Sequence, residues 1–444
     1  MRYTSLKLLS INKEVKKYLQ NTLWIMGGKI TSLGVGFVVT VIVARYLGPE
    51  DFGIFSYALS ISALFSAVGH MGLSGLIVRE IIKKPDERGV TLGTTLGLKF
   101  IGMVLSYTLL LVYAIIYEEV SSSEFTVLVI AGAILLFRPF DIIDFWFQAF
   151  LKAKYVTYAL LWALAVSSVL KLFFVFSSLS VVYFVSANLI QAIAMAIAFL
   201  FIYMTKSELE ITKWSFSWSK AKELFSQGWV IYLGSIFAVI YLKVDQVMLR
   251  WLEGSEAVGI YAAAAQLSEA WYFVPTAIVS SFFPKLIKLR EENSEQFNKR
   301  LQQLFDLLFI LALGVAVIMS LLSEWVVGFL FGVYYVDSAS VLVIHIWAAI
   351  FIFMRAAFSK WILIENVLVF SLITQGAGAL VNVVLNYLLI PSFGVQGAAY
   401  ATLISYSFSS FFSLFIYTKT RPIFIMMLKS IFSPLKYSKV KVFG

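Results

Sequence analysis

Cysteine is absent from this 444-residue sequence, and Asp, Glu, Lys and Arg together make up only 14% of it. Without cysteine, the chain depends on neither disulfides nor thiol chemistry. The two histidines, His70 and His345, are isolated, which favours packed neutral side chains over a proton relay, and no Walker-type phosphate loop is present. Because no loop is long enough to form a catalytic domain, we expect a protein that is not an enzyme. We also expect no metal or cofactor and no direct drive by ATP.

Hydrophobic residues make up 60% of the sequence, and 16% of all residues are aromatic. This composition leaves too little polar surface for a soluble fold and indicates an integral membrane protein. A helix needs about 20 apolar residues to cross the hydrocarbon core of a bilayer. Runs of about that length lie at 22–44, 53–78, 91–117, 125–148, 155–177, 180–204, 224–249, 257–283, 301–322, 338–359, 366–390 and 394–418. Because a chain in lipid must satisfy its own backbone, we expect an all-α polytopic membrane protein with about twelve transmembrane helices.

Basic residues are distributed unevenly between the loops that join these runs. Alternate loops and the two termini carry 27 of the 35 Lys and Arg residues, whereas the opposite loops carry only Arg45 and Arg250. Lys and Arg gather on the cytoplasmic side of membrane proteins, so both termini are predicted to be cytoplasmic. This pattern accounts for the net charge of +10 without nucleic acid. The first apolar run is too long for a cleaved signal peptide, and we expect it to be retained.

A sequence repeat divides the chain into two halves. RYLGPEDFGIFSYA begins at Arg45, and RWLEGSEAVGIYAAA, which aligns with it after a one-residue insertion, begins at Arg250. Each half has an even number of runs, so the halves should be related by a pseudo-two-fold axis along the membrane normal. The predicted parts are two six-helix bundles at 1–204 and 224–418, a cytoplasmic tether at 205–223 and a basic cytoplasmic tail at 419–444.

Three stretches of the sequence resemble one family of membrane transporters. They are ARYLGPEDFGIFSYALS at 44–60, DIIDFWFQ at 141–148 and YLKVDQVML at 241–249. They are similar to polysaccharide repeat-unit flippases of the Wzx, or O-antigen transporter, type, within the multidrug/oligosaccharidyl-lipid/polysaccharide exporter superfamily. The resemblance implies a two-bundle fold that transfers an undecaprenyl-pyrophosphate-linked glycan from the inner to the outer leaflet of a bacterial plasma membrane. The partners it implies are this glycan, membrane lipids, and a polysaccharide polymerase with its chain-length regulator.

Six basic residues fall within the predicted helices rather than in the loops. A charge at such a position is costly unless it faces protein or water. If the six share one cavity, they form a series of positive charges that suits a pyrophosphate moving outward. The candidate cargo-binding residues are Lys29, Lys99, Arg138, Lys171, Lys243 and Arg355. As an alternative, Lys29, Lys171 and Arg355 lie near enough to helix ends to reach the lipid headgroups.

Carboxylates also lie within the predicted helices, at Asp141, Asp144, Asp245 and Glu269. Intramembrane carboxyl groups suit coupling to protons or cations, but they also balance buried cations. Asp141 lies three residues after Arg138, on nearly the same helical face, and is expected to pair with it. Asp245 and Glu269 are less easily explained by a neighbouring cation. We favour Asp144 or Glu269 over Asp141 for a coupling role.

Two prolines interrupt these charged helices. Pro139 removes a backbone donor beside Arg138, and Pro275 does the same six residues after Glu269. Each proline is expected to bend its helix. Bends in membrane helices serve either gating or static helix packing, and the sequence leaves both interpretations open.

The charges and the resemblance favour one function and leave two alternatives. We expect a flippase of the bacterial inner membrane that moves lipid-linked oligosaccharide by alternating access, for a surface polysaccharide such as O-antigen. Protons, cations or the membrane potential could drive it. An ion-coupled multidrug exporter of the same superfamily would suit a cavity dominated by acids, because its cargo is usually cationic. A scaffold of the polysaccharide assembly machinery would keep export intact after charge reversal of Lys99 or Arg138.

Overall fold

Helices account for all regular secondary structure in the part of the chain that the computed structural model describes, residues 2–70, 72 and 74–434. Ten helical stretches within these residues are long and apolar enough to cross a membrane. Two of them are interrupted by a glycine with non-helical backbone angles, Gly48 in the first and Gly394 in the last. Counting each interrupted stretch as two crossings gives the twelve predicted helices. The prediction of an all-α membrane fold is therefore confirmed.

The chain forms two compact units. Unit 1 consists of Met1–Tyr46 and Ile61–Ser235, and unit 2 consists of Leu47–Ser60 and Ile236–Gly444. Two long helices, α1 (Arg2–His70) and α8 (Trp218–Leu252), therefore contribute residues to both units. The short segment 47–60, which the sequence places in the N-terminal bundle, lies in unit 2. The exact limits of the two six-helix bundles stay a prediction.

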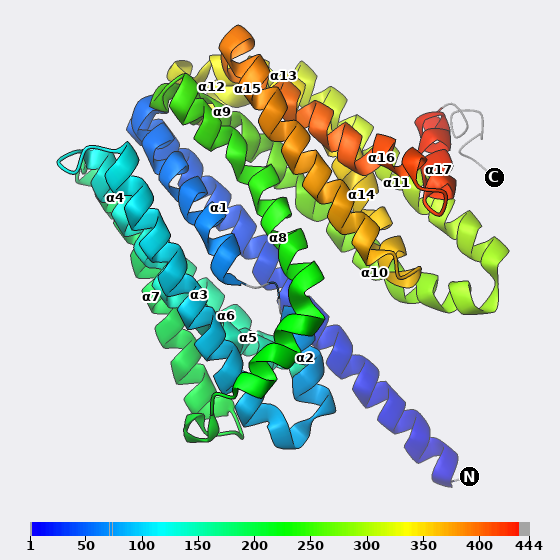
Figure 1. Ribbon diagram of the computed structural model, residues 1–444. Helices are drawn as coiled ribbons and strands as arrows, with labels where there is room; N and C mark the ends of the chain where they lie inside the picture. The colour runs from blue at the N-terminus through cyan, green and yellow to red at the C-terminus, as the bar shows by residue number, and fades with distance from the viewer. Residues whose placement is uncertain (1, 71, 73, 435–444) are drawn as a thin grey trace. The chain divides into compact units, whose positions relative to one another are not determined.

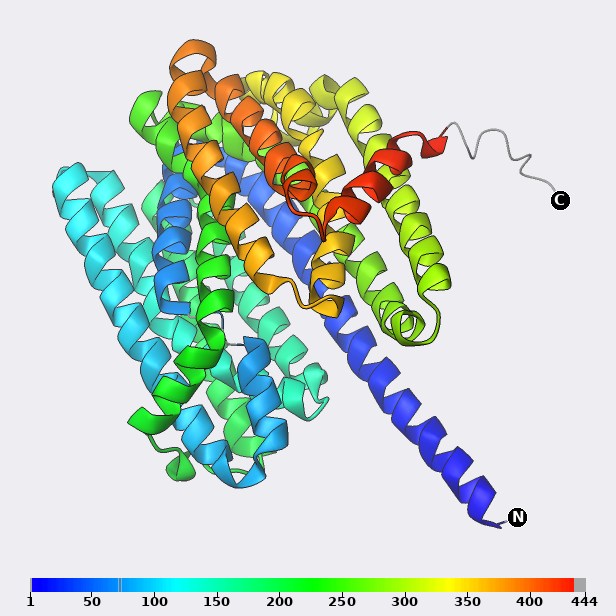
Figure 2. The same ribbon diagram turned by 45° about the vertical axis from the view of Figure 1, so that its right-hand side comes forward.

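Unit 1 contains most of α1 and the helices that follow it as far as the first half of α8. These are α2 (Ser74–Lys83), η1 (Pro85–Glu87), α3 (Arg88–Tyr117), α4 (Ser123–Ala133), η2 (Ile134–Asp141), α5 (Ile142–Ala149), α6 (Ala153–Phe176), α7 (Val181–Lys206) and η3 (Ile211–Lys213). Figures 1 and 2 show α3, α4 and α7 running alongside one another. Ile142, Phe147 and Tyr203 are buried in the apolar interior of the unit. Pro139 lies in η2, a 3-10 segment between α4 and α5, so the helix is distorted beside Arg138 as expected.

Unit 2 contains segment 47–60, the second half of α8 and the rest of the chain. Its further elements are α9 (Ser255–Glu269), η4 (Ala270–Tyr272), α10 (Phe273–Glu292), α11 (Ser294–Leu321), α12 (Ser323–Phe331), η5 (Val333–Tyr335), α13 (Asp337–His345), α14 (Ala348–Ile364), α15 (Leu368–Ser407), the π-helical η6 (Phe408–Phe412), α16 (Ser413–Ile416) and α17 (Arg421–Ile431). Helices α10 and α11 form a hairpin around Asn293 (Figure 2). Phe305, Phe353 and Phe358 fill the apolar core. Pro275 lies in the first turn of α10, directly after the 3-10 segment η4.

The aligned glycines of the sequence repeat have nearly the same backbone conformation. Gly48 has φ 73° and ψ 173°, and Gly254 has φ 95° and ψ −176°. Positive φ at these values is accessible to glycine and strained for other residues. A helical segment follows each glycine at once, the remainder of α1 in one case and α9 in the other. The repeat therefore encodes two equivalent sharp turns.

Candidate functional site

Four of the predicted site residues come together in unit 1. Lys99 belongs to α3, Arg138 and Asp141 to η2, and Asp144 to α5. Helix α3 packs directly against η2, and the charges of the other three residues act on Lys99. The charges of Lys99, Asp141 and Arg138 also act electrostatically on His70, near the end of α1. We call Lys99, Arg138, Asp141 and Asp144 the cation cluster of unit 1.

Arg138 forms the predicted ion pair with Asp141, with 3.9 Å between Nη1 and Oδ2. A 3-10 helix has three residues per turn, so side chains at i and i+3 lie above one another. The Arg138 side chain is nevertheless 54% exposed, and an exposed pair at this distance contributes little. Its guanidinium can therefore engage another anion. Asp144, for which the sequence offered no partner, accepts a hydrogen bond from Gln148 Nε2 at 2.8 Å.

Lys99 is the most deeply buried member of the cation cluster, with only 2% of its surface exposed. Its ammonium Nζ has no hydrogen-bond partner among the described residues and lies 5.2 Å from the centre of the Phe145 ring. The face of an aromatic ring stabilises a cation only partly, and a buried charge is normally paired and hydrogen-bonded. Lys99 therefore offers unused donors to an anion.

Lys171 and Lys29 have different surroundings from the cation cluster. Lys171 Nζ donates a hydrogen bond to Asn188 Oδ1 at 2.7 Å and thereby links α6 to α7. Lys29 is an exposed residue of α1. The structure thus shows Lys171 in a helix-to-helix contact and Lys29 as a surface charge.

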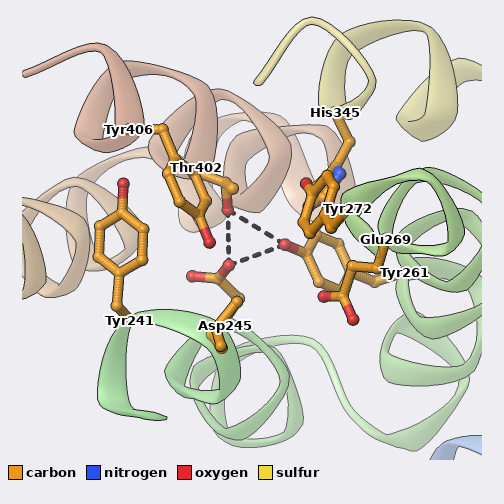
Figure 3. Close-up of a pocket in the computed structure, with 9 residues that line it drawn as sticks. Tyr241, Asp245, Tyr261, Glu269, Tyr272, His345, Thr402 and Tyr406 are labelled. Carbon is orange, nitrogen blue, oxygen red and sulfur yellow. Dashed lines mark hydrogen bonds between the residues drawn. The ribbon is translucent and has the colours of Figure 1, made fainter. Parts of the chain in front are cut away.

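In unit 2, Asp245 of α8 is the centre of a hydrogen-bond network (Figure 3). Its Oδ2 accepts hydrogen bonds from Tyr261 OH at 2.7 Å and from Thr402 Oγ1 at 2.5 Å. Its Oδ1 accepts one from Asn386 Nδ2 at 2.5 Å. Tyr261 lies on α9, whereas Thr402 and Asn386 lie on α15, so the carboxylate joins three helices. The donors are neutral, and the side chain is only 3% exposed.

A small pocket adjoins Asp245 (Figure 3). Its lining residues are Tyr241, Leu242, Asp245, Tyr261, Glu269, Tyr272, His345, Thr402 and Tyr406. The pocket therefore unites two of the predicted coupling residues, Asp245 and Glu269. Its cavity volume is about 10 Å³, which is room for about one water molecule and far below the roughly 300–1,000 Å³ of drug-sized ligand sites. Tyr272 OH and His345 Nδ1 are buried there without a hydrogen-bond partner in the described part of the chain. The pocket suits a proton, a water molecule or a small cation, and it is too small for a sugar chain.

Arg355 and Lys243, the remaining predicted cargo residues, lie near this pocket. Arg355 of α14 donates a hydrogen bond from Nη1 to the carbonyl oxygen of Ser409 at 3.3 Å, and its charge acts on Tyr241. The charge of Lys243 acts on His345. Arg355 thus points into unit 2, so this bond opposes the alternative in which it reaches the headgroups.

A second charged cluster, which the sequence did not predict, surrounds Lys220 at the start of α8. Lys220 is only 5% exposed, although it falls within the predicted cytoplasmic tether at 205–223. Its Nζ lies 2.9 Å from Glu80 Oε2, 2.9 Å from Glu87 Oε2 and 3.2 Å from Glu223 Oε2. The three carboxylates are close enough together to hold a metal ion, but the Lys220 ammonium already bridges them. Lys84 joins the cluster, and its hydrogen bond to Glu223 raises its pKa.

The sequence indicated the charge pairs within each stretch of the Lys220 cluster, but not the contact between the two stretches. Glu80, Lys84 and Glu87 recur at intervals of four and three residues, and Lys220 and Glu223 are three apart, which is the spacing of charge pairs on a helix. Nothing in either stretch indicated that one would pack on the other. The cluster holds α2 and η1 against α8.

Known proteins that are similar to this chain match most of its length. Residues 18–290 match the family described as polysaccharide biosynthesis protein. The "Putative O-antigen transporter" of Shigella flexneri is 24% identical over 336 residues, which cover 73% of this chain and 79% of that protein. The "Probable flippase AglR" of Haloferax volcanii is 25% identical over 397 residues, or 86% of this chain and 80% of that protein.

The fold is similar to that of a solved flippase. The structure titled "Lipid II flippase MurJ, inward closed conformation" superposes with a TM-score of 0.67, covering 95% of this chain and 94% of that one. The two sequences are 14% identical, so the likeness concerns the fold alone.

Proposed function

Because this chain belongs to the polysaccharide biosynthesis protein family, we propose that it flips an undecaprenyl-pyrophosphate-linked oligosaccharide from the cytoplasmic to the outer leaflet. The chain is a multi-pass membrane protein, and the two relatives described above are named as a transporter and a flippase. The cellular setting that we propose is a bacterial inner membrane with both termini in the cytoplasm. The cargo would supply a surface polysaccharide such as O-antigen.

The observation that carries this proposal is the buried ammonium of Lys99, which has no hydrogen-bond partner among the described residues, in the same cluster as the exposed guanidinium of Arg138. Phosphate groups are bound in proteins by Lys and Arg through charge-assisted hydrogen bonds. Lys99 Nζ lacks a hydrogen-bond partner within the described residues, and Arg138 is held only loosely by Asp141. We propose that a pyrophosphate displaces Asp141 from Arg138 and bridges it to Lys99. We propose that Lys29, Lys243 and Arg355 act before or after this step, and that Lys171 instead holds α6 to α7.

For coupling, the Asp245 pocket is the best-supported site. Its carboxylate is surrounded by neutral donors, and Glu269 lines the same small pocket. A buried carboxyl group of this kind changes its interactions when it gains a proton or a cation. We propose that such an event shifts the conformation of unit 2, with Asp144 as the second candidate in unit 1.

The membrane potential adds a driving force that depends on cargo charge alone. With the cell interior negative, each elementary charge that crosses the membrane changes the free energy by about 2.3 kcal/mol per 100 mV. Outward movement of a doubly negative pyrophosphate is therefore favoured by about 4.6 kcal/mol per 100 mV. This term supports export in the proposed direction whether or not an ion is coupled.

A multidrug exporter remains the second candidate, because an acid-lined pocket exists in unit 2. Its size opposes this function, since a cavity of about 10 Å³ cannot hold a drug-sized cation. A scaffold without transport activity would not require a lysine such as Lys99, which is buried in a membrane helix and has no hydrogen-bond partner in the described part of the chain. Both alternatives predict that loss of the Lys99 charge leaves polysaccharide export unchanged.

Complementation of a flippase-deficient strain tests the proposed function. Lys99→Gln and Arg138→Gln should each abolish most surface polysaccharide while membrane abundance stays normal. Lys154→Gln is the matched control, because Lys154 lies outside the cation cluster, 4.8 Å from the ring of its neighbour Tyr155. Normal polysaccharide in both cluster variants would contradict the assigned site, and failure of the native chain to complement would contradict the function.

A further inference from the structure

The two copies of the sequence repeat meet one another inside unit 2. Gly53 and Gly259 are aligned residues of the repeat, and so are Pro49 and Ser255. A Cβ atom added to Gly53 would overlap the backbone carbonyl of Ser255, and one added to Gly259 would overlap the backbone carbonyl of Pro49. The contact is therefore reciprocal. Gly53 lies against Ser255, Gly259 lies against Pro49, and Pro49 and Ser255 are aligned with each other in the repeat. Such an arrangement is the signature of a two-fold contact.

Segment 47–60 is deeply buried around this contact. Phe52 is 2% exposed and Tyr57 is 1% exposed. Ser60 Oγ donates a hydrogen bond to Gln246 Oε1 at 2.6 Å. The Phe52 ring meets the Tyr335 ring edge-on, with 6.3 Å between the centres. The segment is thus a packed part of unit 2, although the residues before 47 and after 60 belong to unit 1.

Both sides of the contact begin at a glycine that can act as a hinge. Gly48 and Gly254 have positive φ, and no atom lies within 4 Å of the position that a Cβ would take. Hinges in proteins are a few residues at the ends of helices that absorb large changes in φ and ψ. The contact between the backbones at Gly53 and Gly259 depends on a close approach, which rotation at either Gly48 or Gly254 would change.

We propose that Gly53 and Gly259 form the outer gate of the transport pathway. In the closed gate the two repeat segments touch through their glycines, and the segments separate when cargo leaves to the outer leaflet. The placement at the outer end follows from the predicted orientation, since Arg45 and Arg250 begin the repeat in the outer loops. This inference rests on the proposed function, because a gate requires a transported cargo.

Accessibility of a single cysteine measures the gate directly, since the native chain has no cysteine. Ser56 lies one turn beyond Gly53 and is 9% exposed. The Ser56→Cys variant is treated in intact cells with a membrane-impermeant maleimide, alone and combined with Gly53→Ala or Gly259→Ala. A methyl group at either glycine prevents closure, so labelling should become about tenfold faster, and export should fall.

Two further glycines provide matched controls for the added methyl group. A Cβ at Gly314 of α11 would meet nothing within 4 Å, whereas one at Gly89 would overlap the carbonyl of Lys213 in unit 1. Gly314→Ala should change neither stability nor labelling. Gly89→Ala should lower stability without faster labelling of Ser56→Cys, which separates gate opening from general loss of structure.

A second measurement uses Ser56→Cys without any glycine variant. It tests the gate even if the glycine variants do not reach normal amounts in the membrane. Ser56→Cys alone should label faster in cells that synthesise the lipid-linked cargo than in cells in which its synthesis is blocked. Labelling that is insensitive both to cargo and to Gly53→Ala would overturn the gate. If labelling responds to Gly53→Ala but the native chain does not restore export, the gate stands and the proposed function fails.

Discussion

The two units differ in the partners that surround their buried charged side chains. In unit 1, Lys99 is buried with its ammonium unpaired among the described residues, and Arg138 is held loosely by one carboxylate. In unit 2, Asp245 is buried with three neutral donors fixed around it. Cations with unused donors suit an anion that arrives and departs. A carboxylate among fixed neutral dipoles suits exchange of a proton or a small cation. The difference suggests that cargo binding belongs to unit 1 and coupling to unit 2.

The largest expected effect on transport comes from Asp245→Asn, which removes the charge and keeps the shape. Transport in proteoliposomes should fall at least about tenfold, a change that corresponds to about 1.4 kcal/mol. Thermal stability should be unchanged or higher, because a buried charge without an ionic partner is removed. Asp306→Asn is the control: Asp306 is equally buried, at 3% exposure, but accepts hydrogen bonds from Gln302 and Ser430 away from the pocket. Equal transport in both variants would break the comparison.

The next effect concerns stability rather than transport. Lys220→Met leaves the buried Glu80 carboxylate without its closest cation, and loss of one partner of a buried pair costs about 3–5 kcal/mol. Thermal unfolding of the purified variant should therefore shift to a clearly lower temperature. Lys222→Met, two residues on at an exposed position, should unfold like the native chain. If Lys220→Met were as stable as the Lys222 variant, the cluster would not hold α8 to α2.

The smallest effect is expected at Lys171. Lys171→Met removes the charge-assisted hydrogen bond to Asn188, and a bond of this kind contributes about 1.5–3 kcal/mol to stability. Export measured by complementation should remain near the native level. Abolished export at normal abundance would instead place Lys171 on the cargo path and extend the cation cluster toward the outer half of unit 1.

The fold could be predicted from the sequence because span length and composition are local properties. The apolar runs and the repeat gave the helix count, and Pro139 indicated the distortion that appears as η2. The Arg138–Asp141 pair was also predictable, since its members lie within one helical turn. These features depend only on residues that are close in the chain.

The environment of Asp245 could not be predicted in the same way. Its donors Tyr261, Asn386 and Thr402 lie 16, 141 and 157 residues away in the sequence. One sequence does not show which distant helices pack together, so the prediction favoured Asp144 or Glu269 over Asp141 and did not single out Asp245. The burial of Lys220 could not be predicted for the same reason, because its partners Glu80 and Glu87 lie on another helix and a 3-10 turn.

Flipping of two defined cargoes tests the central claim most directly. Purified protein in proteoliposomes is given glycans on a pyrophosphate-linked and a monophosphate-linked polyprenol, and the native chain is compared with Lys99→Gln. The native chain should move the pyrophosphate-linked glycan faster, and this preference should disappear in the variant because the buried ammonium is gone. A preference that survives Lys99→Gln unchanged would contradict the assignment of anion binding to the cation cluster of unit 1.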